Sequence, residues 1–204
     1  MRRRDVLEIA AVILTAAFHF VFYHLLPARG PFIVVTTLAW STYFISRIRS
    51  SPESIRSFGL STQGLRQSAI AASVILVVGI GICLAIGLSR GTVRFVPQMV
   101  ILALLYPIWG LVQQLLVQAM VVRNLNPVLS LPLVVAIAAV LFGLVHLPDT
   151  ELALATALLG GIFTVMYVRW RNVWALGICH GLLGVFFYFW VLGRDPWLEI
   201  VASS

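Results

Sequence analysis

Long apolar runs recur along almost the whole chain, and each is close to the length that crosses a membrane. A transmembrane helix needs about 20 apolar residues to cover roughly 30 Å of hydrocarbon. Such runs occupy residues 6–26, 31–48, 68–88, 97–122, 128–147, 151–168 and 173–192. Because lipid offers no partner for backbone polar groups, runs of this length are expected to be helical. We therefore predict an all-α, polytopic transmembrane helical bundle of about seven spans.

The composition excludes an ordinary water-soluble domain. Hydrophobic residues make up 61% of the chain and charged residues 10%, and the mean hydropathy is +1.02. Soluble domains are about 45–50% apolar and about 25% charged. No internal repeat or polar domain interrupts the pattern, so residues 1–204 are interpreted as a single membrane domain. We expect an integral membrane protein of a prokaryotic plasma membrane, with the lipid bilayer as its surroundings.

The basic residues are all arginines, and they cluster between the apolar runs. With the N-terminus in the cytoplasm, the cytoplasmic side collects Arg2, Arg3, Arg4, Arg47, Arg49, Arg56, Arg66, Arg123, Arg169 and Arg171. The other side keeps only Arg29, Arg90, Arg94 and Arg194. This asymmetry predicts a cytoplasmic N-terminus and an external C-terminus. The net charge of +7 is thus explained by loops that flank spans, and no nucleic-acid partner is expected.

One segment between runs is too polar to be a span. Residues 51–66 begin with Ser-Pro-Glu, which is a helix-start signal with Pro52 at the first helical position. Ile55 and Phe58 are three residues apart and would share one face. We expect a short helix lying in the cytoplasmic interface, with a plain polar loop as the alternative.

The informative residues of such a chain are the polar ones inside the runs, since hydrocarbon offers them no partner. Gln113, Gln114 and Gln118 lie within six residues of the fourth run. Gln114 and Gln118 are four apart, so they are expected to share a helix face, with Gln113 rotated by about 100°. These carboxamides form either an inward-facing polar site or interhelical hydrogen bonds worth about 0.6 kcal/mol each.

Two histidines lie in later runs. His146 follows Phe142 by four residues, so the two are expected to stack on one face. His180 lies beside a face of small residues, Gly177, Gly181 and Gly184, which lets a neighbouring helix approach closely. Each histidine alone is most simply a structural hydrogen-bonding group. Together with the glutamines they supply most of the uncharged polar groups of the bundle core.

The remaining histidines are expected to play a lesser part. His19 and His24 lie in the first run, near its far end, and are interpreted as interfacial or structural. Two carboxylates, Asp149 and Glu151, follow His146 closely, but Pro148 and the predicted membrane exit should point them to solvent. A transporter or channel would require acidic residues or broken helices at mid-membrane, and none is found in the sequence.

The order and spacing of the three polar patches resemble the CPBP family of intramembrane proteases, the CAAX-processing, bacteriocin-processing and abortive-infection-related group. That family carries Glu-Glu-x-x-x-Arg, Phe-x-x-x-His and His-x-x-x-Asn or Asp on successive helices. The corresponding segments here are Gln113 to Gln118, Phe142 to His146, and His180 to Gly184. The resemblance covers roughly residues 97–190. It implies a conical helical bundle with a polar, water-accessible cavity inside the membrane.

The resemblance also implies an activity. It suggests a CAAX-protease-like intramembrane endopeptidase whose substrate is a membrane-associated peptide or protein. The catalytic positions would be Gln113, Gln114, Gln118, His146 and His180. His146 and His180 would be the metal ligands, with Zn²⁺ or another divalent metal as cofactor, because neutral imidazoles bind zinc and three protein ligands plus water make a catalytic site.

The chain departs from the family in its charged residues. Glutamines replace both glutamates, Gln118 replaces the arginine, and Gly184 replaces the last polar residue. A carboxamide cannot take a proton from water, and loss of a general base typically removes about 10²–10⁴-fold in rate. Removing both signs of charge together leaves a neutral network, which a membrane core tolerates. Two interpretations follow: an endopeptidase with His146 or His180 as base, or an inactive pseudoprotease that binds and presents a membrane partner.

Overall fold

Helices make up nearly all of the part of the chain that the computed structural model describes, residues 1–24 and 29–202, and no β-strand occurs there. In chain order the elements are α1 (Arg3–His24), α2 (Arg29–Ser50), α3 (Glu53–Ser57), α4 (Leu65–Arg90), α5 (Pro97–Gln114), the π-helix η1 (Leu115–Val122), α6 (Arg123–Leu125), α7 (Leu131–Leu144), α8 (Thr150–Trp170), α9 (Val173–Phe186), the π-helix η2 (Phe187–Val191) and α10 (Pro196–Ala202). The predicted all-α fold is confirmed.

Several of these helices have the length and the outward-facing side chains of membrane spans. Five are long and apolar enough to cross a membrane: Arg3–Phe22, Leu65–Arg90, Pro97–Leu125, Thr150–Trp170 and Val173–Val191. The apolar helix α7 has 14 residues, which is about 21 Å at 1.5 Å per residue. Large apolar side chains such as Val77 and Leu154 point away from the bundle, as lipid-facing residues do. The chain is an integral membrane protein, and about seven spans stays a prediction.

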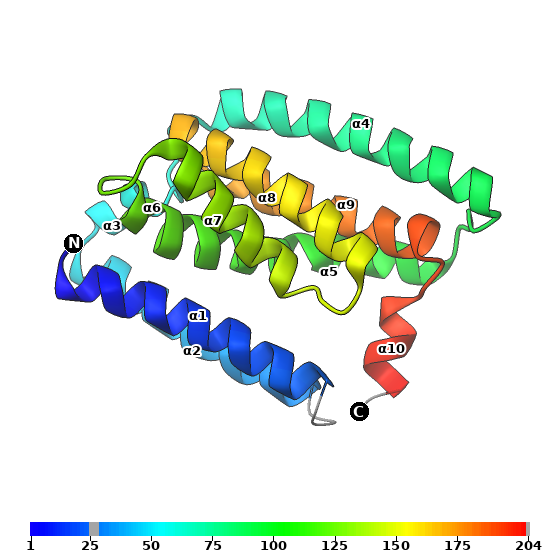
Figure 1. Cartoon of the computed structure of the whole chain (residues 1–204), viewed down its shortest axis with the longest axis horizontal. Coiled ribbons are helices and arrows are strands. Elements are labelled where there is room, and N and C mark those ends of the chain that lie inside the picture. Colours follow the sequence, from blue (N-terminus) through cyan, green and yellow to red (C-terminus); the bar gives the residue numbers. More distant parts are fainter. Residues whose placement is uncertain (25–28, 203–204) are drawn as a thin grey trace.

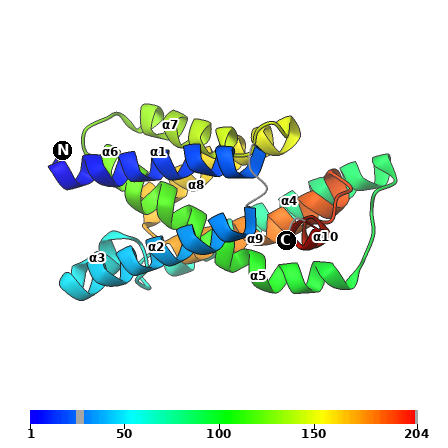
Figure 2. The ribbon, with the colours of Figure 1, turned by 90° about the horizontal axis from the view of Figure 1, so that it is seen from below.

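The helices that carry the three polar patches lie in the middle of the bundle. Figure 1 shows α5, α7, α8 and α9 between the α1–α2 hairpin on one flank and α4 on the other. The most extensive packing is that of α5 on α9, α7 on α8, and α4 on α9. The view from below shows the N-terminal helices extending along the central ones (Figure 2), and α1 contacts η1 directly. The flanking helices therefore cover the central polar residues from both sides.

The close packing of α9 on α5 depends on glycine, as the sequence predicts. A Cβ on Gly177 would lie 2.6 Å from Leu111 Cα, and one on Gly181 would overlap the backbone of Tyr106 and Pro107. At Gly184 a Cβ would make only an ordinary contact, 3.5 Å from the ring of Tyr106. Because the backbones of α5 and α9 touch at Gly177 and Gly181, side chains on the two helices can reach each other directly.

Polar caps fix the starts of the last two long helices. The Asp149 carboxylate accepts a hydrogen bond from the backbone N–H of Leu152 at 3.2 Å, at the start of α8. The Asn172 side chain accepts one from the backbone N–H of Ala175 at 3.3 Å, at the start of α9. Each cap satisfies a backbone donor that the first helical turn leaves open.

A short helix forms where the interfacial helix was expected, but its apolar residues separate. Pro52 is the N-cap of α3 rather than its first residue. Phe58 is fully buried, whereas Ile55 remains 38% exposed. The two residues differ in burial because α3 ends at Ser57 and the chain turns at Gly59, which has a positive φ of 79°.

Candidate functional site

The helix that carries the glutamines changes its winding within the first motif. The α-helical part, α5, ends at Gln114, and the π-helix η1 continues from Leu115 to Val122. Hydrogen bonds in a π-helix span five residues, so each turn is wider and side chains four apart diverge. Gln114 and Gln118 are both fully buried, yet Gln114 contacts α9 and Gln118 contacts α8. The single polar patch expected from α-helical spacing is therefore divided.

Gln114 makes a hydrogen bond to the imidazole of His180. The Gln114 amide nitrogen lies 3.2 Å from His180 Nδ1. An amide nitrogen only donates, so Nδ1 accepts and a neutral His180 carries its proton on Nε2. This amide orientation leaves Gln114 Oε1 without a partner among the described residues. It also leaves one of the two amide N–H groups without one. The rings of Phe142 and Phe163 flank the imidazole, with centroids 5.7 and 6.2 Å away.

His146 has the opposite protonation pattern. Helix α7 ends at Leu144, so His146 lies in the turn that follows rather than on the helix. Its Nδ1–H donates to the carbonyl oxygen of Phe142 at 2.7 Å, which leaves the lone pair of a neutral imidazole on Nε2. The expectation that Phe142 and His146 stack on one helix face is wrong, because His146 lies beyond the end of α7. The Phe142 ring packs against His180, and the link to His146 is a backbone hydrogen bond.

Both histidines reach one cavity of about 510 Å³ between α4, α5, α8 and α9. Gln113 also lines it, whereas Gln114 lies behind His180. None of the described residues that line this cavity is acidic. The nearby carboxylates are engaged elsewhere, since Asp149 pairs with Arg194 at 2.8 Å and Glu151 with Arg90 at 2.8 Å. The cavity therefore presents two imidazoles and a carboxamide within mostly apolar walls.

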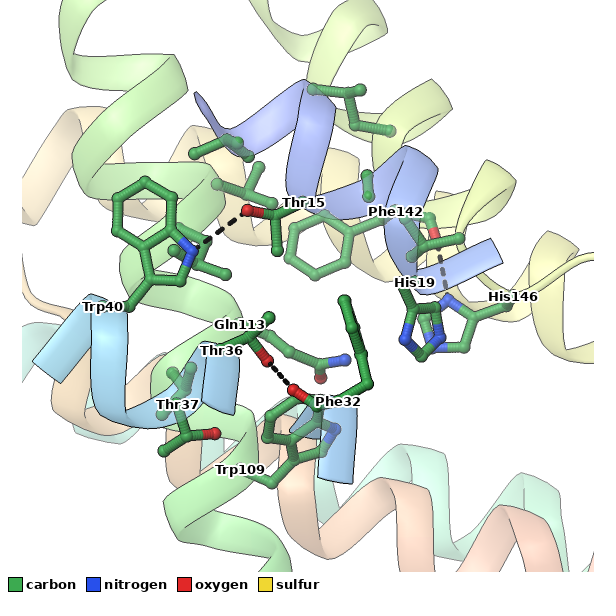
Figure 3. Close-up of a pocket in the computed structure, with 17 residues that line it drawn as sticks. Thr15, His19, Phe32, Thr36, Thr37, Trp40, Trp109, Gln113, Phe142 and His146 are labelled. Atoms are coloured by element: carbon green, nitrogen blue, oxygen red, sulfur yellow. Dashed lines mark hydrogen bonds between the residues drawn. The ribbon is translucent and has the colours of Figure 1, made fainter. Parts of the chain in front are cut away.

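A second, smaller cavity of about 100 Å³ adjoins the first and shares Trp109, Gln113 and His146 with it. Its other wall comes from α1 and α2 and includes His19 (Figure 3). In Figure 3, His19 and His146 lie on the same side of this cavity. The nearby Thr15 hydroxyl is already engaged, because it accepts a hydrogen bond from the Trp40 indole at 3.2 Å.

His19 lines the small cavity, a position that its place in the sequence did not predict. It was expected to be interfacial or structural, and it borders the cavity that contains His146. A usable signal is its helical spacing from Val12 and Thr15, which lie seven and four residues earlier and line the same cavity. The side chain of His24, assigned the same role, lies outside the described residues.

Gln118 is separate from both cavities. Its amide N–H donates to the hydroxyl of Thr164 at 3.3 Å, and that hydroxyl donates to the carbonyl oxygen of Gly160 at 2.8 Å. This is an interhelical hydrogen bond between η1 and α8, the alternative role considered for the glutamines. Of the five predicted site residues, Gln113, Gln114, His146 and His180 gather at the cavity and Gln118 does not.

The residues at the cavity do not fit a zinc centre with three protein ligands. Among the described residues, no group of three or more His, Cys, Asp or Glu side chains is arranged to hold a metal ion. His180 has its Nε2 protonated in the neutral form, so that nitrogen has no lone pair for a metal. Of the two predicted metal ligands, only His146 has its Nε2 lone pair available.

One comparison with known proteins bears on this site. Residues 92–186 match the family model described as type II CAAX prenyl endopeptidase Rce1-like. No curated protein and no solved structure matches the chain. The matched segment contains α5 through α9 and all five predicted site residues. This match over residues 92–186 agrees with the resemblance of the three motifs to the CPBP intramembrane proteases.

Proposed function

We propose that this chain is an intramembrane endopeptidase that cuts membrane-associated peptides or proteins. The Rce1-like family is a family of proteases, which supports hydrolysis of a peptide bond at the level of the family. The observation that carries the proposal is the pair of imidazoles in one cavity. His146 offers a lone pair at Nε2, and His180 offers an N–H at Nε2.

The two histidines have the complementary roles that amide hydrolysis needs. His146 Nε2 takes a proton from water as the water oxygen attacks the carbonyl carbon, a step worth about 10²–10⁴-fold. His180 Nε2–H donates to the oxygen that becomes negative, which typically contributes about 10²–10³-fold. The protonated His146 then gives its proton to the leaving amine as the C–N bond breaks. Gln114 is a positioning residue, since it sets the protonation of His180.

The cavity suits an apolar substrate segment. Its walls come largely from aliphatic side chains of α4, α5 and α8, such as Val78, Ile82 and Leu159. A volume of about 510 Å³ accommodates a few residues of extended peptide rather than a folded domain. A substrate would therefore present a short apolar stretch at the membrane, which fits a membrane-associated peptide or the end of a membrane protein.

The test is cleavage of a membrane-anchored reporter peptide by the purified chain in proteoliposomes. We expect His146→Ala and His180→Ala each to reduce kcat by about 100-fold or more, because each removes one of the two roles. Val78→Ala only enlarges the cavity, so it should change KM more than kcat. Thermal unfolding of each variant separates loss of chemistry from loss of folding. Full turnover by the folded histidine variants would refute these assignments.

A second candidate function is that of a pseudoprotease that binds and presents a membrane partner. It is favoured by one observation, the absence of acidic residues among the described residues that line the two cavities. The triple variant Gln113→Glu/Gln114→Glu/Gln118→Arg restores the residues that the resemblance implies. If wild type does not cut and this variant does, the natural chain is a binding protein on an intact protease scaffold. A specific membrane partner that co-purifies with His146→Ala/His180→Ala would support the same conclusion.

Metal content distinguishes the proposed two-histidine chemistry from the zinc chemistry that the resemblance implied. We expect well below one metal ion per chain, because the described residues lack a third ligand. The measurement compares wild type with His146→Ala/His180→Ala, purified in detergent without chelators. Near-stoichiometric zinc that the double variant loses would overturn the metal-independent mechanism.

A further inference from the structure

A strongly basic cavity lies at the arginine-rich end of the bundle, away from the histidines. It encloses about 740 Å³ near the N-terminus, where α1, α2, α3 and α6 meet the turn after α8. In Figure 1 this is the end marked N. Five arginines line it, namely Arg2, Arg4, Arg47, Arg123 and Arg171, against two acidic residues, Asp5 and Glu53. Five positive charges less two negative ones leave +3 on the lining residues, and the buried Glu8 behind Arg123 and Arg47 lowers this to +2.

The inner wall of this cavity is rigid. Arg123 Nη2 lies 2.6 Å from the carboxylate of Glu8, and Arg47 Nε lies 3.7 Å from it. The ring of Phe58 packs beneath both guanidinium groups, 4.8 Å from Arg123 Cζ and 5.9 Å from Arg47 Cζ. One buried carboxylate thus holds two arginines in place while neutralising a single charge. Arg47, Arg123 and Glu8 together therefore carry a net charge of +1 in a fixed geometry.

The outer wall carries arginines that no contact within the described chain explains. The side chains of Arg4 and Arg171 make no hydrogen bond or ion pair to the described residues, although both line the cavity. Arg171 is the C-cap of α8, with a positive φ of 47°. Glycine is the usual residue in that conformation, and a side chain there is strained. The chain therefore places an arginine at this edge in spite of its backbone geometry.

The charge, geometry and position of this cavity match one ligand chemistry. Guanidinium forks bind phosphate oxygens in a bidentate manner, and fixed forks lose little entropy on binding. The cavity lies at the ends of membrane-spanning helices, at the predicted cytoplasmic face, where anionic headgroups concentrate. We propose that it binds a phosphate group, supplied by the headgroup of an anionic phospholipid. This site is independent of the proposed peptidase chemistry.

The test uses the full chain, purified in a neutral detergent, and its thermal unfolding. A ligand that binds only the folded state raises Tm with its concentration. Short-chain phosphatidylglycerol should raise Tm, whereas short-chain phosphatidylcholine, whose phosphate is neutralised by choline, should not. Arg4→Gln/Arg171→Gln should weaken the apparent affinity by about tenfold or more. The matched control, Arg49→Gln/Arg66→Gln, removes two exposed arginines of the same end that do not line the cavity.

Each outcome decides the proposal. Absence of a shift with phosphatidylglycerol, or equal weakening by both arginine pairs, overturns it, because the latter would mean that only the general charge of this end matters. A shift with inorganic phosphate that equals the lipid shift, and that Arg4→Gln/Arg171→Gln abolishes, retains the site and identifies free phosphate as the source. A shift with the lipid alone identifies the headgroup.

Discussion

At Gln114 a single atom, an amide nitrogen where a glutamate would have an oxygen, decides which nitrogen of His180 carries the proton. A glutamate at this position would only accept a hydrogen bond, so His180 would donate from Nδ1 and keep its lone pair on Nε2. The carboxamide donates to Nδ1 at 3.2 Å, and the proton moves to Nε2. Glutamine at this position therefore makes His180 a hydrogen-bond donor at Nε2, where a glutamate would leave it a potential base or metal ligand.

Gln114→Glu should reverse this protonation pattern. We expect Nδ1 of His180 to be unprotonated in wild type and protonated in the variant, because a carboxylate cannot donate. The ¹⁵N chemical shifts of the imidazole, measured by NMR in bilayers, report the change directly. His146 is the internal control, since its Nδ1–H donates to Phe142 in both proteins. Identical His180 shifts in wild type and Gln114→Glu would disprove the assigned orientation of the Gln114 amide.

At the scale of elements, the α5–α9 contact decides which polar groups meet. Gly177 and Gly181 bring the two backbones together, and this contact places His180 within reach of Gln114. The π-helix η1 has the opposite effect, because it turns Gln118 away toward Thr164 on α8. Packing and helix winding together select the residues of the site from a larger set of polar side chains.

Gly181→Ala should destabilise the bundle. A Cβ there overlaps the backbone of Tyr106 and Pro107, which cannot move aside as a flexible side chain could, and overpacking of this kind typically costs about 1–3 kcal/mol. Unfolding in detergent measures the loss. The matched control is Gly81→Ala, where a Cβ meets nothing within 4 Å, so the helix should gain about 0.5–1 kcal/mol. Equal stability of the two variants would contradict the close approach of α5 and α9.

At the scale of the whole molecule, one buried carboxylate ties the N-terminal hairpin to α6, the segment that follows the three glutamines. Glu8 of α1 is 4% exposed. It accepts hydrogen bonds from Tyr43 of α2 at 2.5 Å and from Arg123 and Asn124 of α6 at 2.6 and 2.7 Å. Because α1 also supplies His19 to the small cavity, this network holds one wall of the site in place.

Glu8→Ala should destabilise the protein by about 3–5 kcal/mol, since it leaves two largely covered arginines, 12% and 18% exposed, without their counter-charge. The matched control is Glu151→Gln. It breaks an ion pair of similar length, 2.8 Å, whose side chains are 44% and 49% exposed, and exposed pairs contribute only about 0–1 kcal/mol. Chemical unfolding in detergent compares the two. A loss below about 1 kcal/mol for Glu8→Ala would show that this network does not hold the hairpin.

The sequence by itself determined the properties that depend on local spacing. The length of the apolar runs predicts membrane-spanning helices, because every backbone polar group in lipid must be satisfied within its own segment. The small-residue face at Gly177 and Gly181 predicts a close helix contact. The order of the three motifs predicts the family that residues 92–186 match. Each of these features can be read from neighbouring positions in the chain.

Only the tertiary structure decided which polar groups meet. The separation of Gln118 from Gln114 follows from a π-helix, and the placement of His146 follows from the end of α7 at Leu144. His19 joins the site because the α1–α2 hairpin packs against η1 from outside the matched segment. The basic cavity gathers arginines that are far apart in sequence. Such contacts are set by packing between distant segments, and the spacing of residues along one helix does not encode them.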